Sequence, residues 1–282
     1  MAISWLNRLA LSDIRKYIPA PIRTNLRKAG TTMGLLDERA LKVNLGTLYK
    51  SDTFVTSYPK SGNTWVRFLI ANMHHPEKTI TFRNLEKYVP MKKRSPERIA
   101  QMDPPRYMKT HMPRFEYFPW CVYIYRDVRD VAISFYHFAE QHSWYDGTLS
   151  EFVRDDWPWQ NIWLSWDEHV ERAIEASQRR PDRFLLLQYE TMLEQPLAEA
   201  RRLAQFCNLD LSEEELRTAV ADSSFENLQS LEEKYGHETE EDDVTFFRKG
   251  ERRQWKEELD NSDRKVLIER FGNTLERLGY PT

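Results

Sequence analysis

The segment from Tyr58 to Thr64 has the residue types of a phosphate-binding turn. It reads Y-P-K-S-G-N-T, with an apolar, β-branched stretch before it and a longer apolar stretch after it. A strand, a glycine-bearing turn and a helix N-terminus direct free N–H groups and the positive end of the helix dipole at an anion. Lys60 adds a full positive charge. A plain strand-turn-helix junction would explain the apolar flanks but not this polar turn, so we expect a phosphate site here.

The residue order in this turn differs from that of nucleotide triphosphatases. Their loop reads G-x-x-x-x-G-K-[ST], with the lysine after the last glycine and the hydroxyl on magnesium. Here Lys60 precedes Gly62, so that pattern is not met. Two alternatives stay open: a P-loop kinase-like phosphotransferase, which predicts dependence on magnesium, and a non-catalytic nucleotide-binding module, which predicts a broken base or loop.

Two further side chains are suited to chemistry beside an anion. His111 has an ordinary pKa close to neutrality and can take a proton from an attacking hydroxyl, a contribution of roughly 10²–10⁴ in rate. Arg126 carries a planar guanidinium that makes two charge-assisted hydrogen bonds to one phosphate. A lone histidine after a strand is usually structural, but a phosphate-binding turn beside it favours the catalytic interpretation.

Alternating strands and helices must position these residues. The sequence predicts strands over 53–57, 106–109, 120–125 and 183–187, and helices over 65–73, 82–88, 96–102, 128–140, 196–206, 212–220 and 262–278. This alternation predicts an α/β fold with a mainly parallel sheet flanked by helices. The Lys60 turn, His111 and Arg126 each follow a strand, so they should meet at the carboxyl edge of the sheet.

Length and composition limit the classes of protein to consider. The chain has 282 residues and a formal net charge of −3, which suits one α/β domain and gives no reason to expect a nucleic-acid partner. Cys121 and Cys207 lie in separate apolar runs and form no metal-ligand pattern. No apolar run approaches the roughly 18 residues of a membrane span, and no signal-peptide core is present. We expect a cytoplasmic protein.

Residues 1–50 have a different character from the rest. The first 30 residues carry six basic side chains against one acid, with apolar residues on one helical face. We expect a helical extension packed on a single domain formed by residues 51–282. Weak contact of this amphipathic helix with an anionic membrane surface is the alternative.

Several separated motifs resemble those of sulfotransferases, especially the cytosolic type. The turn with its tryptophan, Y-P-K-S-G-N-T-W, resembles their 5′-phosphosulfate loop, although many members have threonine in place of Asn63. K-T-H at 109–111, R-D-V-R-D-V-A-I-S at 126–134, Y-E-T-M at 189–192, S-S-F at 223–225 and F-R-K-G at 247–250 follow in family order. The resemblance extends from about Thr53 to Trp255.

The resemblance implies a donor, a fold and a set of roles. The donor is 3′-phosphoadenosine 5′-phosphosulfate, the product is adenosine 3′,5′-bisphosphate, no metal is required, and the fold is related to that of P-loop nucleotide kinases. His111 is the general base, and Lys60, Lys109 and Ser134 support catalysis. The implied nucleotide-binding residues are Lys60, Ser61, Gly62, Asn63, Thr64, Trp65, Arg126, Ser134, Tyr189, Ser224, Phe225, Arg248, Lys249 and Gly250. Among them Arg126, Ser134, Arg248, Lys249 and Gly250 hold the 3′-phosphate. The acceptor is a hydroxyl, with an amine as the alternative, on a small or lipid-like molecule.

Three further segments bear on the acceptor, on assembly and on access. S-W-D-E-H-V at 165–170 resembles the stretch that borders the acceptor pocket, which makes Trp166 and His169 candidate acceptor contacts. Packing in the core explains these side chains equally well. The family's dimerisation segment is not recognisable at Leu259, so the sequence gives no prediction for or against a dimer. The acidic residues 232–243 are expected to form a loop, either solvated or acting as a lid.

Overall fold

The computed structural model describes residues 48–92, 95–155, 164–236, 250 and 252–282. Its described part contains one four-stranded sheet, formed by β1 (Thr53–Ser57), β2 (Tyr107–Thr110), β3 (Trp120–Tyr125) and β4 (Phe184–Gln188). The strands are all parallel and lie in the order β2-β1-β3-β4. The predicted α/β class with a parallel sheet is confirmed. The second and fourth strands each lie one residue later in the chain than predicted.

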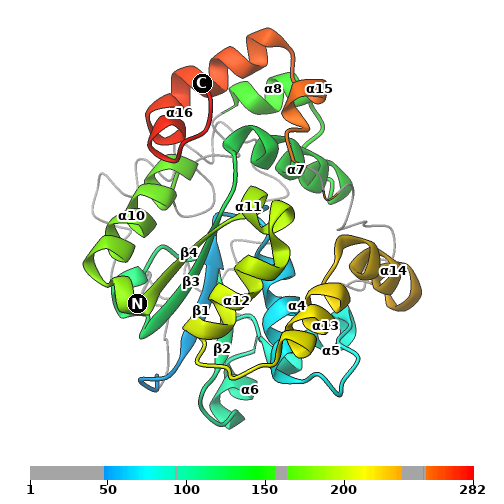
Figure 1. Cartoon of the computed structure of the whole chain (residues 1–282). Coiled ribbons are helices and arrows are strands. Elements are labelled where there is room, and N and C mark those ends of the chain that lie inside the picture. The colour runs from blue at the N-terminus through cyan, green and yellow to red at the C-terminus, as the bar shows by residue number, and fades with distance from the viewer. Residues whose placement is uncertain (1–47, 93–94, 156–163, 237–249, 251) are drawn as a thin grey trace, which may run out of the picture.

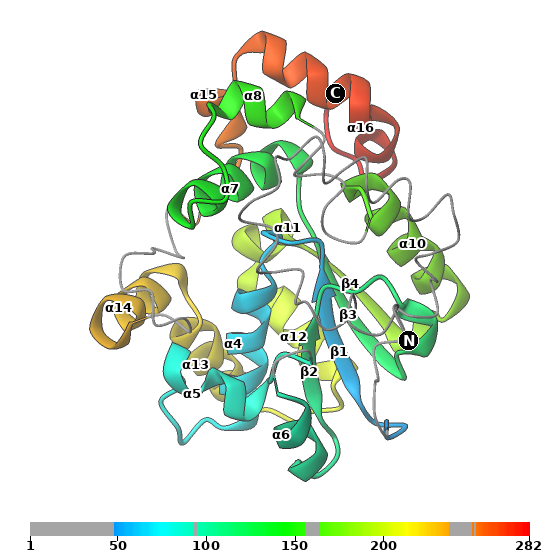
Figure 2. The same cartoon turned by 180° about the vertical axis from the view of Figure 1, so that it is seen from behind.

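Helices connect and cover the strands (Figures 1 and 2). In chain order they are α4 (Asn63–His74), α5 (Phe82–Tyr88), α6 (Pro96–Gln101), α7 (Val128–Gln141), α8 (Leu149–Arg154), α10 (Trp166–Arg179), α11 (Tyr189–Glu194), α12 (Pro196–Phe206), α13 (Glu213–Asp222), α14 (Phe225–Tyr235), α15 (Trp255–Glu258) and α16 (Asn261–Arg277). Single turns of 3₁₀ helix span Phe115–Tyr117 and Pro181–Arg183. Of these helices α8, α10, α11, α14 and α15 were not predicted from the sequence.

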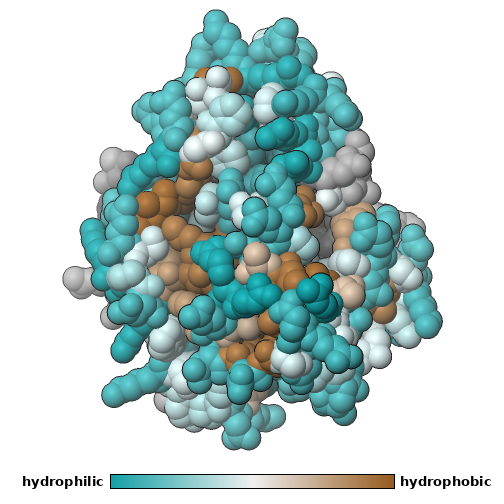
Figure 3. All heavy atoms as spheres, viewed as in Figure 1, coloured by the Kyte–Doolittle hydropathy of each residue, from teal (hydrophilic) through white to brown (hydrophobic). Residues whose placement is uncertain are grey.

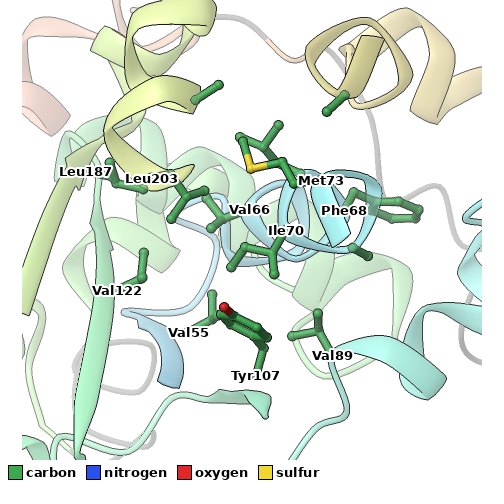
Figure 4. Packing of buried hydrophobic residues seen from close by; sticks show 14 of the residues in the cluster. Val55, Val66, Phe68, Ile70, Met73, Val89, Tyr107, Val122, Leu187 and Leu203 are labelled. Atoms are coloured by element: carbon green, nitrogen blue, oxygen red, sulfur yellow. The ribbon is translucent and has the colours of Figure 1, made fainter. Parts of the chain in front are cut away.

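Alternate side chains of the buried strands pack into two separate apolar cores. Val55 and Val122 point to one face, where side chains of α4, α12 and α13 cover them. Figure 4 shows this packing, with Tyr107 and Leu187 at the same face. Phe54 and Tyr123 point to the other face, against α10 and α16. Both faces are covered, as expected for strands without a hydrophilic face. The sheet is therefore a fixed platform from which the loops at its carboxyl edge project.

One expectation about the acidic segment is corrected. Residues 232–235 do not open a loop, because α14 continues through Tyr235 and ends at Gly236, which has a positive φ of 76°. Glutamate and lysine are good helix formers, and Glu232 is buried on the inner side of this helix. The rest of the acidic segment, and the predicted N-terminal extension up to residue 47, lie outside the described residues.

The face of the described part that Figure 3 shows is mainly hydrophilic. In Figure 3 apolar residues gather between α10 and α12, on the side where β4 forms the edge of the sheet. Among the residues described, no helix combines the length and the apolar character that a membrane span requires.

Candidate active site

The carboxyl ends of the strands bring the predicted residues to one edge. His111 directly follows β2, and its Nδ1 atom lies 2.8 Å from the carbonyl oxygen of Ser57, the last residue of β1. Arg126 directly follows β3, and its Nη1 atom donates to the carbonyl oxygen of Lys60 at 3.4 Å. The predicted meeting of the Lys60 turn, His111 and Arg126 is confirmed, because parallel strands place all their carboxyl ends on the same side.

The turn between β1 and α4 is held in an unusual backbone conformation. Lys60 and Gly62 have positive φ angles of 67° and 98°, and Gly62 is the N-cap of α4. A Cβ atom at Gly62 would come within 2.7 Å of the Tyr189 ring, so both backbone and space require glycine there. Ser61 is fully buried between them. This conformation leaves the N-terminus of α4 open toward the edge of the sheet.

The polar atoms of the turn fit an anion such as a phosphate. The Asn63 amide donates to the Val55 carbonyl oxygen at 3.2 Å and to Ser57 Oγ at 3.5 Å, which anchors α4 to β1. The hydroxyl of Ser61 and Oδ1 of Asn63 are buried and have no hydrogen-bond partner in the described part of the protein. Thr64 is also buried, in the first turn of α4. Buried hydroxyls are normally hydrogen-bonded, so the unpartnered Ser61 hydroxyl indicates a place for a ligand oxygen.

Lys60 sits in a strongly positive environment. Desolvation first, and the charges of Lys109 and Arg126 next, lower its pKa from 10.5 to about 7, while Glu232 acts in the opposite direction. Its Nζ atom lies 4.1 Å from the centre of the Phe138 ring. Three cationic side chains gathered at one place repel each other, so a bound polyanion would relieve this repulsion.

His111 is held as a neutral imidazole with a defined tautomer. The Ser57 carbonyl can only accept, so Nδ1 of His111 carries the proton and Nε2 carries the free electron pair. Burial first, and the charge of the nearby Lys109 next, lower the pKa of His111 from 6.5 to about 3. A neutral imidazole with a free Nε2 is the form that can accept a proton.

An aromatic ring lies against the guanidinium of Arg126, and a second ring packs on the first. The guanidinium carbon lies 4.2 Å from the centre of the Tyr189 ring, and the Trp65 ring meets Tyr189 edge to face at 5.6 Å. Nη2 of Arg126 is 3.9 Å from the carboxylate of Asp130, one turn along. Three of the residues predicted at the nucleotide, Trp65, Arg126 and Tyr189, thus form one contiguous group.

The remaining predicted nucleotide contacts come from α7, α14 and the C-terminal segment. Ser134 is half-buried on α7, eight positions after Arg126. Ser224 caps α14 by accepting from the Asn227 N–H at 3.3 Å. Gly250 has a φ of 63°, and a Cβ atom there would come within 2.1 Å of the Phe225 ring, so the R-K-G and S-S-F motifs meet. Arg248 and Lys249 lie outside the described residues.

Asp130 is a residue of the site that the sequence interpretation did not single out. Its carboxylate accepts the main-chain N–H of Arg253 at 2.7 Å and that of Trp255 at 3.1 Å. It therefore ties the chain after Gly250 to the helix that starts beside Arg126. The available signal was its place in the first turn of the helix, four residues after Arg126, where an acidic side chain can reach the arginine.

The two candidate acceptor contacts are both buried. Trp166 is 0% exposed and meets Phe271 edge to face at 5.7 Å in the core beneath α16. His169 is 1% exposed, and its Nε2 atom lies 3.1 Å from the carbonyl oxygen of His111. Neither side chain faces solvent in this structure. For Trp166 this agrees with packing in the core. His169 lies behind the candidate base, next to its main chain.

An aromatic cluster lies beside Lys60 instead. Around Phe138 stand the rings of His142 and Trp144, with centres 4.0 and 5.3 Å away. Trp144 is 54% exposed. Lys60 contacts this cluster directly through the Phe138 ring. The described residues contain no group of three or more histidine, cysteine or acidic side chains placed to hold a metal ion.

Comparisons with known proteins agree with these motifs. A family model described as the sulfotransferase domain matches residues 50–279. A flavonol sulfotransferase-like protein of Flaveria bidentis is 27% identical over 256 residues, covering 79% of this chain and 82% of that protein. Sulfotransferase 1 family member D1 of Rattus norvegicus is 29% identical over 232 residues, covering 74% of this chain and 78% of that protein.

Solved structures share the fold. A retinol dehydratase in complex with retinol and PAP matches with a TM-score of 0.67 and 22% identity, over 84% of this chain and 85% of that chain. A mouse sulfotransferase complexed with PAP matches with a TM-score of 0.64 and 20% identity, over 86% of this chain and 94% of that chain. At such identities the likeness concerns the arrangement of the sheet and helices.

Proposed function

The chain belongs to the sulfotransferase family and catalyses sulfuryl transfer, and we propose that its donor is 3′-phosphoadenosine 5′-phosphosulfate and that His111 is its general base. The acceptor in this proposal is a hydroxyl group of a small, largely apolar molecule. The observation that carries the proposal is the position of His111. Its Nδ1 atom is fixed on Ser57 at 2.8 Å, at the end of the same strand that leads into the Lys60 turn.

The donor would be held at its two charged ends. At the sulfated end, the buried Ser61 hydroxyl without a protein partner, the Lys60 ammonium and the N-terminus of α4 provide the contacts. At the other end, Arg126 and Ser134, with Arg248, Lys249 and Gly250, hold the 3′-phosphate. Trp65 and Tyr189 supply ring surfaces for adenine. Gly250 against Phe225 supports this arrangement, because it brings the C-terminal motif to the adenine side.

In the proposed reaction His111, Lys60 and Lys109 have separate roles. His111 takes the proton of the acceptor hydroxyl on Nε2 as the new S–O bond forms. The donor supplies the sulfuryl group, and the bond from sulfur to the 5′-phosphate oxygen breaks, releasing adenosine 3′,5′-bisphosphate. Lys60 stabilises the negative charge that develops on that oxygen, and Lys109 adds to the positive field. No protein group changes its oxidation state, so positioning and electrostatics account for the catalysis.

The aromatic cluster supports an apolar acceptor. Phe138, His142 and Trp144 form a ring-lined surface in contact with Lys60, and Trp144 is largely exposed. Flat or polycyclic alcohols and phenols would stack there while a hydroxyl reaches His111. Related proteins carry names that refer to flavonols, and a solved structure of similar fold holds retinol. We place the enzyme in the cytoplasm, because two relatives are named cytosolic sulfotransferases.

The test is a screen of acceptor classes with two donors. Phenols, flavonols, steroids, retinoids and amines are incubated with 3′-phosphoadenosine 5′-phosphosulfate, and products are detected by a mass gain of one SO₃ group. Adenosine 5′-phosphosulfate, which lacks the 3′-phosphate, is the matched control donor. We expect sulfation of at least one hydroxyl class with the first donor only. Equal rates with both donors would contradict the assigned donor, and sulfation of amines alone would contradict the hydroxyl acceptor.

A further inference from the structure

His169 has two hydrogen bonds that connect the candidate base to the core. Its Nε2 atom lies 3.1 Å from the main-chain carbonyl oxygen of His111, and its Nδ1 atom lies 2.7 Å from the hydroxyl of Tyr123. The carbonyl can only accept, so Nε2 of His169 carries the proton. Nδ1 then has the free electron pair and accepts the hydroxyl hydrogen of Tyr123. Each atom of the imidazole that can form a hydrogen bond has a partner.

The ring of His169 is also fixed by packing. It stacks on Tyr123 at 5.6 Å between centres and meets Tyr58 and Phe115 edge to face, each at 5.7 Å. Ser165 is the N-cap of α10, so the helix begins one turn before His169. Burial lowers the pKa of His169 to about 4, so the imidazole is neutral at physiological pH.

These contacts close a ring of hydrogen bonds around the base. The hydroxyl of Tyr123 has a hydrogen bond to the main chain of Tyr58, which immediately follows β1. From Tyr123 the connection passes through His169 to the carbonyl of His111, and the His111 side chain returns to the carbonyl of Ser57. The main chain of His111 is therefore held through His169 and Tyr123, and its side chain is held by Ser57. Both connections end at neighbouring residues at the end of β1, Tyr58 and Ser57.

From this arrangement we propose that His169 is a positioning residue for the reaction: as a neutral Nε2–H tautomer oriented by Tyr123, it fixes the main chain of His111 so that Nε2 of the base points at the acceptor. This inference rests on the proposed role of His111. In this proposal His169 does not contact the acceptor, because its side chain is only 1% exposed. It lies behind the base and contacts the main chain of His111. A displacement of about 1 Å in a reacting group can reduce turnover about a hundredfold.

The first test uses two substitutions of different chemistry. In His169→Gln the side-chain amide reaches the position of Nε2 and can still donate to the His111 carbonyl. In His169→Phe the ring shape is kept, but the donor is lost. With a phenol that the wild type sulfates, we expect His169→Phe to reduce kcat about a hundredfold, as for a misplaced base. His169→Gln should recover at least about tenfold of that loss, which is about 1.4 kcal/mol. The dissociation constant of adenosine 3′,5′-bisphosphate should change less than about twofold.

A double-variant cycle separates positioning from general damage. If His169 acts only through His111, then His169→Phe should reduce turnover little further when His111→Ala is already present. His74→Phe is the matched control, because His74 is another largely buried histidine, at the opposite end of α4 from the Lys60 turn. We expect this control to keep wild-type turnover. Independent, multiplicative losses in the double variant, or wild-type turnover in His169→Phe, would overturn the proposal.

A second measurement does not depend on activity, and its main result comes from the wild-type protein. Nitrogen-15 spectra of the imidazoles in the wild-type protein report which ring nitrogen carries the proton. We expect His169 to be a neutral Nε2–H tautomer between about pH 6 and 8 and to change to the other tautomer or to a mixture in Tyr123→Phe. A protonated Nδ1 of His169 in the wild type would overturn the proposal. Wild-type turnover in His111→Ala would instead contradict the proposed base. The tautomer of His169 would then describe the structure but no role in the reaction.

Discussion

The Nδ1–H of His111 donates to the carbonyl oxygen of Ser57 at 2.8 Å, which joins the ends of two neighbouring parallel strands. This bond fixes the imidazole so that its free electron pair is on Nε2. It also ties the candidate base to the strand that leads into the Lys60 turn. The distance between base and turn is thus set by the sheet, and the sheet is covered on both faces.

Donor binding should weaken as pH rises above about 7. The pKa of Lys60 is lowered from 10.5 to about 7 by desolvation first and by Lys109 and Arg126 next, so the free protein loses this positive charge above that pH. Binding of an anion then has to restore the proton, and affinity should fall by up to about tenfold per pH unit. The measurement is calorimetric titration of adenosine 3′,5′-bisphosphate from pH 6 to 9.

The control for this prediction is Lys60→Arg, because arginine stays charged throughout this range. We expect the variant to bind with an affinity that changes little between pH 6 and 9. Constant affinity over the whole range in the wild type would show that Lys60 keeps its proton in the free protein.

The turn should not tolerate a side chain at Gly62. Gly62→Ala would place a methyl group 2.7 Å from the Tyr189 ring and force alanine into a left-handed backbone at a φ of 98°. Gly279→Ala is the matched control, since it has a φ of 78° and no atom within 4 Å of the added carbon. Both variants should lose about 1–2 kcal/mol of unfolding free energy from the backbone alone. Only Gly62→Ala should bind adenosine 3′,5′-bisphosphate at least about tenfold more weakly; equal binding by the two variants would contradict the assigned turn.

Asp130 should matter for nucleotide binding although we assign it no contact with the nucleotide. Asp130→Asn replaces one acceptor oxygen by a donor facing the N–H groups of Arg253 and Trp255, and hydrogen bonds to a charged group contribute about 1.5–3 kcal/mol each. We expect a lower unfolding free energy and about tenfold weaker binding of adenosine 3′,5′-bisphosphate. Glu140→Gln, at an exposed acidic position of the same helix, serves as the control in calorimetry and urea unfolding. Unchanged binding by Asp130→Asn would mean that the chain after Gly250 keeps its place without this anchor.

Sulfuryl transfer should not need a divalent metal. Lys60, Lys109 and Arg126 gather positive charge at the candidate site, and the described residues offer no cluster of metal ligands. We expect turnover to be the same with and without excess EDTA. Loss of activity in EDTA, with recovery on addition of magnesium, would favour the kinase-like alternative.

The sequence predicted the edge of the sheet well, because its signals are local. A run such as W-C-V-Y-I-Y at 120–125, short and rich in aromatic and β-branched residues, favours a buried strand, and a residue directly after such a strand lies at its carboxyl end. His111 and Arg126 were predicted at this edge because each follows a predicted strand and each lies in a motif that resembles one of sulfotransferases. Helix limits were predicted to within two residues for α4, α7, α12, α13 and α16.

Contacts that depend on tertiary packing could not be predicted from local sequence patterns. The bond between His169 and His111 joins residues 58 positions apart, and that between Asp130 and Arg253 joins residues 123 positions apart. No local pattern shows that α10 packs on the face of the sheet where Tyr123 lies. For the acidic segment, composition suggested a loop, but Leu228 and Glu232 are buried on one side of α14 and keep residues 232–235 helical.

The most direct test of the account is the single-turnover rate of His111→Ala. Wild type and variant, each saturated with 3′-phosphoadenosine 5′-phosphosulfate, are mixed with an acceptor found in the screen, and formation of the sulfated product is followed. The account predicts a rate lower by roughly 10²–10⁴ in the variant, with the dissociation constant of adenosine 3′,5′-bisphosphate changed by less than about twofold. A rate close to that of the wild type would contradict the assignment of His111 as the general base.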